Sequence, residues 1–443
     1  MPGKSVTGIG ILGLGVIGSR VARILSEQPT ALTQHIKDDL EIVSVLVKDL
    51  QKHRSFPPPG VKITDDPEII LNHPDIQLII EVMGGENPTV DYIKQAITAG
   101  KHVITANKEV IAKHGPDLLI LARAFGTEVR FEAAVGAGLP ILRSLQEDLL
   151  ANDISSIHAI INGTTNYILT KMAHENLDFD SALRQAQELG FAETNPDNDV
   201  HGLDASYKLA ILAMLAFHSK VEASDIYYEG ITNLKVQDFE YAHELGYEIK
   251  LLAIAKKKGH TIQLRVHPTL VTQQSALANI NGVNNAIQIQ GDLVGSVVYS
   301  GEGAGSQSTA SAILGDLISI TKNQKINKAR IPLNALSESD QISYISKKRF
   351  KIQPISELIT RYYLRLNVAD RVGVLAQIAT VMGDHNISLA SVIQKDADTK
   401  TNSAELVIAT HPALEVELQA ALQQLKTLGS VKEINNVIRV NPD

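Results

Sequence analysis

The chain contains 443 residues, of which 44% are hydrophobic and 20% charged, and its 41 Lys+Arg against 49 Asp+Glu give a net charge of −8. This length and composition predict a globular protein of two to four domains, and the mild acidity argues against nucleic-acid or anionic-membrane partners. The lack of cysteine excludes disulfides, thiolate metal sites and a cysteine nucleophile.

Nothing in the sequence predicts a membrane protein. The longest apolar run, Leu209–Phe217, is far shorter than the roughly 20 residues of a spanning helix. The Gly-rich N-terminal stretch has neither the apolar core nor the cleavage site of a signal peptide. We therefore expect a cytoplasmic protein.

Residues 6–130 alternate between strand-like and helix-like segments. This alternation is typical of a parallel sheet with helices on both faces. Strands are expected at Val6–Leu12, Glu41–Val47, Gln77–Val82 and Lys101–Thr105, and helices at Gly18–Ser26 and Thr89–Ala99.

The following residues, to about 335, predict a central α+β domain and a final helix. Strands are expected at Ile154–Ile161, Thr261–Val266 and Ala286–Gln290, and helices at Tyr167–Glu175, Ser181–Leu189, Asp204–Phe217 and Thr309–Ser319. The polar stretch 336–360 carries Lys347, Lys348 and Arg349 and predicts a solvated linker.

The last 80 residues or so predict a small βαββαβ module. Strands are expected at Tyr362–Val368, Leu389–Gln394, Ala404–Thr410 and Val431–Val440, and helices at Val374–Gly383 and Ala413–Thr427.

A glycine-rich motif follows the first predicted strand and opens the first predicted helix. In this context glycines allow a tight turn, close approach of a pyrophosphate and close helix–strand packing, which predicts a dinucleotide site. The motif is Gly13-Leu14-Gly15-Val16-Ile17-Gly18.

The residues after the second predicted strand bear on the type of cofactor. Lys48, Lys52 and Arg54 favour the 2′-phosphate of NADP, whereas Asp49 leaves NAD open. The alternative is that these are ordinary surface charges after a strand.

Thr105-Ala106-Asn107-Lys108 comes directly after a predicted strand. Ligands bind at the carboxyl ends of strands in open parallel sheets. Lys108 is therefore a candidate to bind phosphate or substrate or to donate a proton, and the alternative is a solvated loop lysine.

Four carboxylates and a lysine precede the long apolar helix, namely Glu193, Asp197, Asp199, Asp204 and Lys208. Asp204 and Lys208 are spaced i,i+4 and share a helix face. Because the helix then becomes apolar all round, we expect Lys208 in a cleft, where a lysine can do acid–base work. The stretch from Asp197 imitates a calcium loop, but the twelfth position is Lys208 and not glutamate, so we exclude calcium.

Two further loops are rich in small residues. Glu132–Pro140 could expose carbonyls to a hard cation, although a tight turn is the simpler interpretation. Gly301–Ser306 precedes a predicted helix and fits either a second anion-facing helix N-terminus or a crossing between domains. The histidines are isolated, so we assign no transition-metal site.

Taken together, the motifs resemble homoserine dehydrogenase over about residues 6–335, and the C-terminal module, with its segment Asp370–Leu375, resembles an ACT domain. The resemblance rests on GLGVIG, EVMGG (Glu81–Gly85), AGKHVITANK (Ala99–Lys108), EAAVGAGLPI (Glu132–Ile141), INGTTNYIL (Ile161–Leu169) and the stretch Ala186–Ala213. It matches the monofunctional bacterial form with a C-terminal ACT domain. It implies an α/β chain with a Rossmann-type domain at 1–140, rejoined at about 305–335, a substrate and dimerisation domain at 141–304, a linker at 336–360 and a ferredoxin-like ACT domain at 361–443.

The resemblance also implies the reaction and the partners. The family reduces L-aspartate 4-semialdehyde reversibly to L-homoserine with NAD(P)H, in threonine and methionine biosynthesis. We expect NADP over NAD, a homodimer or homotetramer, threonine as an effector at the ACT domain, and neither nucleic acid nor membrane as a partner.

By the same resemblance, Lys208, Lys108 and Asp204 carry the catalysis, with Lys208 as the proton donor. Glu193, Asp199, Asp204, Lys208, Gly163 and Thr164 bind the substrate, beside Asn162. The glycine motif, Lys48, Arg54, Thr105, Lys108 and Gly303 bind the cofactor. Glu132 and the carbonyls of Val135, Ala137 and Leu139 match a sodium site.

Two alternatives remain open from the sequence. One is another NADP-dependent reductase of an amino-acid aldehyde; aspartate-semialdehyde dehydrogenase itself is excluded because it needs a cysteine. The other is a catalytically silent amino-acid sensor that binds nucleotide without turnover, against which Lys108, Asp204 and Lys208 argue.

Overall fold

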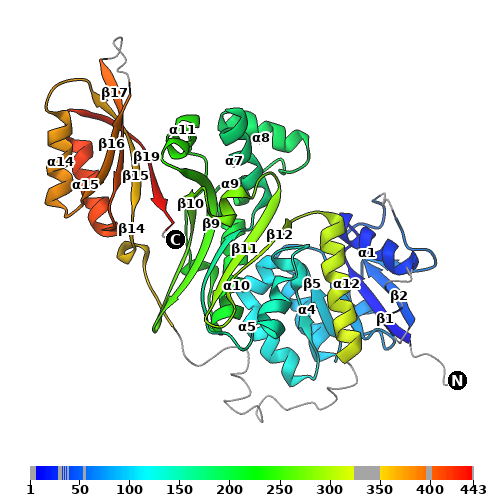
Figure 1. The fold of residues 1–443 in the computed structure, drawn as a ribbon. Coiled ribbons are helices and arrows are strands. Elements are labelled where there is room, and N and C mark those ends of the chain that lie inside the picture. The colour runs from blue at the N-terminus through cyan, green and yellow to red at the C-terminus, as the bar shows by residue number, and fades with distance from the viewer. Residues whose placement is uncertain are drawn as a thin grey trace.

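The computed structural model describes residues 6–27, 39–52, 56–323, 350–395 and 402–441, together with residues 32, 34 and 36. It has a parallel sheet at one end, a large mixed sheet in the middle and a small α/β module at the other end (Figure 1). No helix in these ranges is long and apolar enough to cross a membrane.

The N-terminal part is a six-stranded parallel sheet in the order β3-β2-β1-β4-β5-β6. The order reverses between β1 and β4, and at such a switch point the loops that leave the strands diverge and open a crevice. The strands are β1 (Val6–Leu12), β2 (Asp39–Leu46), β3 (Lys62–Thr64), β4 (Leu78–Glu81), β5 (His102–Thr105) and β6 (Val129–Arg130). The flanking helices are α1 (Val16–Glu27), α3 (Glu68–Leu71), α4 (Thr89–Thr98) and α5 (Lys108–Ala124).

The central part packs helices on a mixed sheet. Its strands are β7 (Ile154–Ile160), β8 (Tyr227–Tyr228), β9 (Tyr247–Lys258), β10 (Thr261–Thr272), β11 (Asn284–Gly291) and β12 (Gly295–Glu302). Its helices are α6 (Ile141–Arg143), α7 (Gly163–Glu175), α8 (Phe179–Glu188), α9 (Asp197–Val200), α10 (Leu203–Phe217) and α11 (Val236–Glu244). Helix α10 is buried along most of its length, as its uninterrupted apolar sequence predicts.

Helix α12 (Ser306–Asn323) returns the chain to the parallel sheet and packs beside α1 (Figure 1). Its apolar side chains Ile313, Leu317 and Ile320 share a buried cluster with Ile9 and Val21. The chain between α12 and residue 350, where most of the expected linker falls, lies outside the described residues.

The C-terminal module has the βαββαβ order expected from its sequence. It comprises β15 (Tyr362–Ala369), α14 (Val374–Asp384), β16 (Leu389–Gln394), β17 (Ser403–Thr410), α15 (Glu415–Thr427) and β19 (Val431–Val440), with the short strands β13 (Lys351–Ile352), β14 (Ile359–Thr360) and β18 (Ala413–Leu414). Strand β19 also pairs in parallel with β10, so the module extends the central sheet and is joined to it edge to edge.

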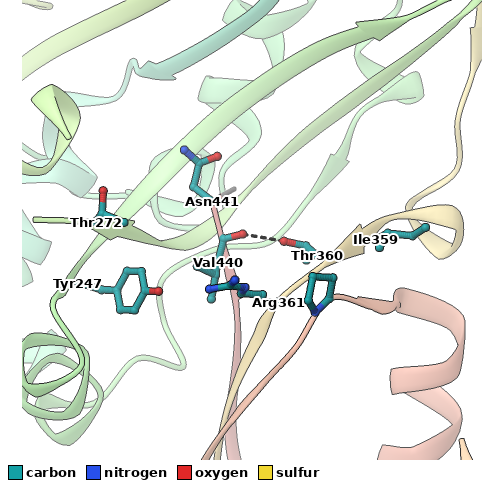
Figure 2. Close-up of a pocket in the computed structure, with 8 residues that line it drawn as sticks. Tyr247, Thr272, Ile359, Thr360, Arg361, Val440 and Asn441 are labelled. Atoms are coloured by element: carbon teal, nitrogen blue, oxygen red, sulfur yellow. Dashed lines mark hydrogen bonds between the residues drawn. The ribbon is translucent and has the colours of Figure 1, made fainter. Parts of the chain in front are cut away.

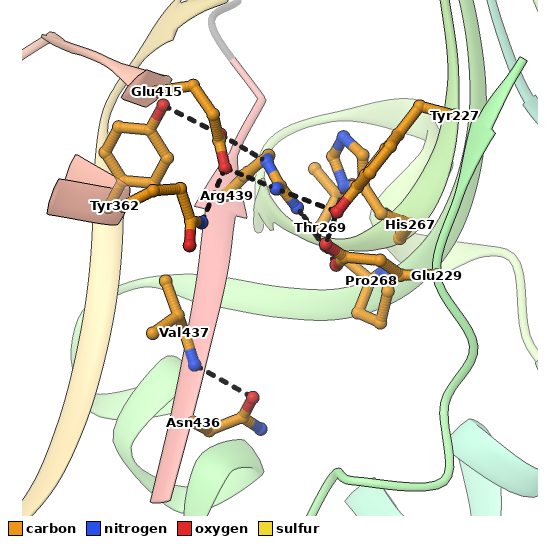
Figure 3. Close-up of polar contacts among 11 residues, drawn as sticks. Tyr227, Glu229, His267, Pro268, Thr269, Tyr362, Glu415, Asn436, Val437 and Arg439 are labelled. Atoms are coloured by element: carbon orange, nitrogen blue, oxygen red, sulfur yellow. Dashed lines mark hydrogen bonds and ion pairs between the residues drawn. The ribbon is translucent and has the colours of Figure 1, made fainter. Parts of the chain in front are cut away.

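Buried ion pairs hold this junction together. Arg365 on β15 binds Asp238 on α11 at 2.7 Å. Figure 3 shows Arg439 of β19 between Glu415 of its own module and Glu229 of the central part, at 2.7 Å and 2.9 Å respectively. Removing one partner of a pair buried on both sides, such as Arg365–Asp238 or Arg439–Glu415, typically costs about 3–5 kcal/mol. Glu229 is 37% exposed, so solvent weakens its contact with Arg439.

The expected elements are present, with ends displaced by a few residues. Strands β9 and β12 and helices α11 and α5 are not among the elements expected from the sequence, and Lys108, expected just beyond a strand, lies in the first turn of α5. The sequence predicts one helix from Ala413, but Ala413 and Leu414 form β18, which pairs with β14, and α15 begins at Glu415.

Candidate active site

The glycine motif forms the turn between β1 and α1 and lies beside the switch point of the parallel sheet. Gly13 has φ +103° and an added Cβ would stand 2.8 Å from the Val82 carbonyl, whereas a Cβ on Gly18 would be 2.1 Å from the Gly13 carbonyl. Gly15, in contrast, is exposed and a Cβ there would contact nothing within 4 Å. The outer two glycines are therefore required by packing, and Gly15 leaves open space at the helix N-terminus where a pyrophosphate would approach.

A buried carboxyl fixes the next strand end along this edge. Glu81, at the end of β4, accepts hydrogen bonds from the Thr105 hydroxyl and from the Met83 backbone N–H at 2.7 Å. Burial raises the pKa of Glu81. The Thr105 hydroxyl in turn accepts from the Asn107 N–H at 2.9 Å. This series of hydrogen bonds, from Glu81 through Thr105 to Asn107, sets the position at which α5 begins.

Asn107 caps α5 and places Lys108 in its first turn. The Asn107 Oδ1 accepts from the Val110 N–H at 3.2 Å, and its Nδ2 donates to the Gly85 carbonyl at 2.7 Å. Thr105 and Lys108, both predicted from the sequence, thus lie at the carboxyl edge of the parallel sheet, beside the glycine motif.

Asp204 joins this edge to the central part. Its carboxylate forms ion pairs with Lys108 of α5 and with Lys208, one turn further along α10, the latter at 2.9 Å. Asp204 is 3% exposed, Lys208 11% and Lys108 44%. Lys208 Nζ also donates to the Ile161 carbonyl at 2.8 Å. The two predicted lysines therefore share one buried carboxylate.

The charges in this cluster depend on one another. Burial alone would raise the pKa of Asp204, but Lys208 and Lys108 hold it well below its usual range. Burial alone would lower the pKa of Lys108, but the negative charge of Asp204, with Asp199 and Glu193 farther away, raises it instead. Burial, and secondarily repulsion by Asp204, raises the pKa of Asp199.

Asn162 connects the carboxylates. Its Nδ2 donates to Asp199 at 2.7 Å and to Asp204 at 2.9 Å, while its Oδ1 caps α7 by accepting from the Thr165 N–H. Gly163 follows, with an added Cβ only 2.8 Å from the Val283 carbonyl. The Thr164 hydroxyl donates to the Phe191 carbonyl at 2.6 Å.

Glu193 is exposed on the loop after α8, and its carboxylate makes no hydrogen bond or ion pair with another described residue. Asp199 and Glu193 both lie close enough to Lys108 for their charges to influence it. The arrangement thus offers carboxylates that could bind an ammonium group next to lysines that could serve an oxygen.

The short helix α9, which carries Asp199, rests on the segment that follows β8. The Ile231 N–H donates to the Val200 carbonyl at 2.9 Å. A Cβ on Gly230 would stand 2.2 Å from the same carbonyl, and one on Gly202 3.1 Å from the carbonyl of Glu229. Glu229 forms the ion pair with Arg439 of β19, so the C-terminal module supports the segment on which α9 rests.

The loop predicted to resemble a sodium site lies between β6 and α6. Both carboxylate oxygens of Glu132 accept backbone N–H groups at 2.8 Å, from Leu142 and Arg143. The buried carbonyls of Val135 and Ala137 accept no hydrogen bond from any described residue, whereas that of Leu139 accepts from Ile141. The oxygen donors fit a hard cation. Among the described residues no group of three or more His, Cys, Asp or Glu could hold a metal ion.

Lys48, Arg54 and Gly303 are the remaining residues that the resemblance assigns to the cofactor. Lys48 is exposed after β2, and Arg54 lies outside the described residues. Gly303 precedes α12, where an added Cβ would be 1.8 Å from the amide of buried Asn285, so packing alone requires glycine there.

The sequence reading did not single out Glu81 or Asn107, which position the start of α5. An acid at the end of the apolar strand QLIIEV was the available signal, because acids are seldom fully buried without a partner.

Comparison with known proteins identifies the family of the chain. The family model described as "Homoserine dehydrogenase, NAD binding domain" matches residues 13–132, "Homoserine dehydrogenase" matches 140–318, and "ACT domain" matches 362–430. A homoserine dehydrogenase of Synechocystis sp. is 42% identical, covering 98% of this chain and 99% of its own. One from Corynebacterium glutamicum is 38% identical, covering 100% and 98%.

Solved structures give the same result. The crystal structure of a homoserine dehydrogenase from Thiobacillus denitrificans has a TM-score of 0.89 and 36% identity, covering 99% of each chain. A hyperthermophilic archaeal homoserine dehydrogenase in complex with NADPH has a TM-score of 0.61 and 26% identity, covering 72% of this chain and 98% of its own.

Proposed function

The chain belongs to the homoserine dehydrogenase family of NAD(P)-dependent oxidoreductases, and on that premise we propose how its residues divide the work of interconverting L-homoserine and L-aspartate 4-semialdehyde. The observation that carries the proposal is the buried Asp204 carboxylate between Lys108 and Lys208, at the edge of the cofactor sheet. Asp199, Glu193 and Asp204 hold the substrate ammonium, with Gly163 and Thr164 lining the same site.

Lys208 is the proton donor in the reducing direction. The nicotinamide supplies a hydride to the aldehyde carbon when bound. Lys208 Nζ gives a proton to the carbonyl oxygen as negative charge develops there, and in the oxidising direction it takes that proton back. Its contacts with Asp204 and Ile161, at 2.9 and 2.8 Å, orient the amine. Lys108 adds positive charge close to the same oxygen.

The glycine motif, Thr105 and Gly303 line the cofactor site, and Lys48 and Arg54 select NADP over NAD through the 2′-phosphate. Open space at Gly15 and the exposed position of Lys48 support this assignment. We assign a sodium site to the loop between β6 and α6, with Glu132 and the carbonyls of Val135, Ala137 and Leu139 as its ligands. The ion would balance the negative charge of Glu132 where the parallel sheet meets the central part.

Regulation and assembly are the finer parts of the proposal. Threonine inhibits the enzyme through the ACT module, with the Asp370–Gly373 turn as its contact, and thereby adjusts threonine and methionine biosynthesis. Two or four copies associate through the central part. Strand β12 is an edge strand of the large sheet and, with the loop before it, exposes Leu293, Val294 and Val298, which supports pairing there.

Steady-state oxidation of L-homoserine with NADP and with NAD, with and without L-threonine, tests these assignments. We expect turnover with both cofactors, a higher kcat/KM with NADP, and inhibition by threonine. A folded protein that binds NADPH but turns over with neither cofactor would refute the enzymatic assignment and favour a nucleotide-binding sensor. Turnover that does not respond to threonine would refute only the regulatory part.

A further inference from the structure

A pocket of about 360 Å³ lies where the C-terminal module joins the central sheet. Residues 359–361 lead into the module, while Val440 ends β19 beside β10 and Asn441 follows it, and both segments line the pocket together with Pro412. Figure 2 shows Tyr247 and Thr272 on the opposite side, where β9 and β10 pair. The pocket thus touches the segment that enters the module, the end of β19 that pairs with β10, and the central sheet itself.

The backbone around the pocket is already hydrogen-bonded. The Val440 N–H donates to the Arg361 carbonyl at 2.9 Å, and the Asn441 N–H donates to the Leu270 carbonyl at 2.9 Å. The Thr360 hydroxyl donates to the Val440 carbonyl at 2.7 Å (Figure 2). These hydrogen bonds hold the backbone of both segments in place, so the side chains are the first groups to consider for a ligand.

Three polar side chains at the pocket have unused binding capacity. Arg361 is exposed, and neither its guanidinium nor the Tyr247 hydroxyl makes a hydrogen bond or ion pair with another described residue. Asn441 is only 8% exposed, yet its Oδ1 is buried and has no hydrogen-bond partner among the described residues. A buried acceptor without a donor is uncommon in native proteins and indicates a missing partner.

These groups define the chemistry of the ligand. The guanidinium of Arg361 would bind a carboxylate with paired hydrogen bonds, and Asn441 Oδ1 needs a donor. Ile359, Pro412 and Val440 supply apolar walls. A plain anion would leave the Asn441 acceptor unused, whereas an α-amino acid satisfies both groups at once. The volume is at the lower end of ligand pockets and suits such a small molecule.

We propose that this junction pocket is a binding site for a free α-amino acid, with its carboxylate on Arg361 and its ammonium on Asn441. The site is separate from the Asp370–Gly373 turn and does not depend on that turn binding anything. An amino acid in the pocket bridges the segment that enters the module, the end of β19 and the β9–β10 pair, so it stiffens the junction next to the active site.

Calorimetric titration of the full chain tests the proposal. The probes are L-threonine, L-methionine and L-alanine, with L-lactate and inorganic phosphate as ligands that lack the ammonium. We expect saturable binding of at least one amino acid at roughly millimolar concentration or below, at least about 10-fold tighter than phosphate or lactate. Arg361→Gln should weaken it by about 10-fold or more, because a charge-assisted hydrogen bond is lost.

Matched variants identify the site. Asn441→Leu and the milder Tyr247→Phe should also weaken binding at the pocket, while Lys208→Met in the active site should not. Arg371→Gln should weaken only the threonine binding assigned to the turn and should leave binding at the pocket intact. Hydrogen exchange should slow at the Val440 and Asn441 amides when the amino acid is bound. The proposal is overturned if no probe binds, if phosphate binds as tightly as the amino acids, or if Arg371→Gln or Lys208→Met abolishes binding while Arg361→Gln leaves it intact.

Discussion

Replacing Lys208 by methionine tests the assignment of the proton donor most directly. Methionine keeps an unbranched stem in the 11% exposed position on α10 but removes the amine that contacts Asp204 and the Ile161 carbonyl. General acid–base catalysis typically contributes about 10²–10⁴-fold, so we expect kcat to fall by about that factor.

The structure predicts a smaller effect on folding and on cofactor binding. Asp204 would keep its ion pair with Lys108 and its 2.9 Å hydrogen bond from Asn162, so its charge would remain compensated. The Ile161 carbonyl would lose one donor, at a cost of about 1–3 kcal/mol. The dissociation constant of NADPH should change by no more than about 3-fold, because the pyrophosphate contacts lie at the glycine motif.

The assay is steady-state homoserine oxidation together with NADPH titration and thermal unfolding. Lys113→Met is the matched control, because Lys113 is a partly exposed lysine on α5 that pairs with Glu86 and Glu109. Lys108→Met is the comparison within the site and should lower kcat less than Lys208→Met. Near-normal kcat in Lys208→Met, with a large loss in Lys108→Met, would refute our assignment and make Lys108 the donor.

Three further predictions concern the glycine motif, the ion pair between Glu229 and Arg439, and the buried carboxyl of Asp316. Gly15→Ala should leave the melting temperature unchanged and weaken NADPH binding about 10-fold or more. Gly13→Ala should instead destabilise the fold, because Gly13 has φ +103° and a Cβ there would stand 2.8 Å from a backbone oxygen. Equal loss of melting temperature in both variants would contradict this prediction. Glu229→Gln breaks the ion pair with Arg439 and should loosen the segment on which α9 and Asp199 rest. The KM for homoserine should rise several-fold while the KM for NADP stays unchanged. An equal rise in both KM values would argue against a local effect on α9. Burial raises the pKa of Asp316 to about 7, so its ionisation opposes folding and stability should fall as pH rises from about 4 to 7. Asp316→Asn should remove that loss, so the melting-temperature difference between the variant and the wild type should grow from about pH 4 to 7 and then level off. A difference that is constant with pH would contradict the argument.

Much of the fold could be read from local patterns. The glycine motif between a strand and a helix, the alternation of short apolar strands with helices up to residue 130, and the βαββαβ order after residue 361 each depend on interactions close in sequence. Strand β9 was missed because YEIKLLAIAKKK runs from an apolar centre into three lysines, which hides the strand pattern. Helix α5 was missed because its start depends on the Asn107 cap and on Glu81, far away in sequence.

Local sequence patterns identify the types of residue in the site, since Lys108, Asp199, Asp204 and Lys208 stand out through their charge beside apolar segments. That Lys108 and Lys208, which are 100 residues apart, share one carboxylate follows only from the packing of α5 against α10. Only the tertiary structure decided that β19 extends the central sheet and that Arg439 reaches Glu229. The physical reason is that helix and strand patterns arise from neighbouring residues, whereas strand order and buried ion pairs depend on how distant segments pack, and no local pattern encodes that.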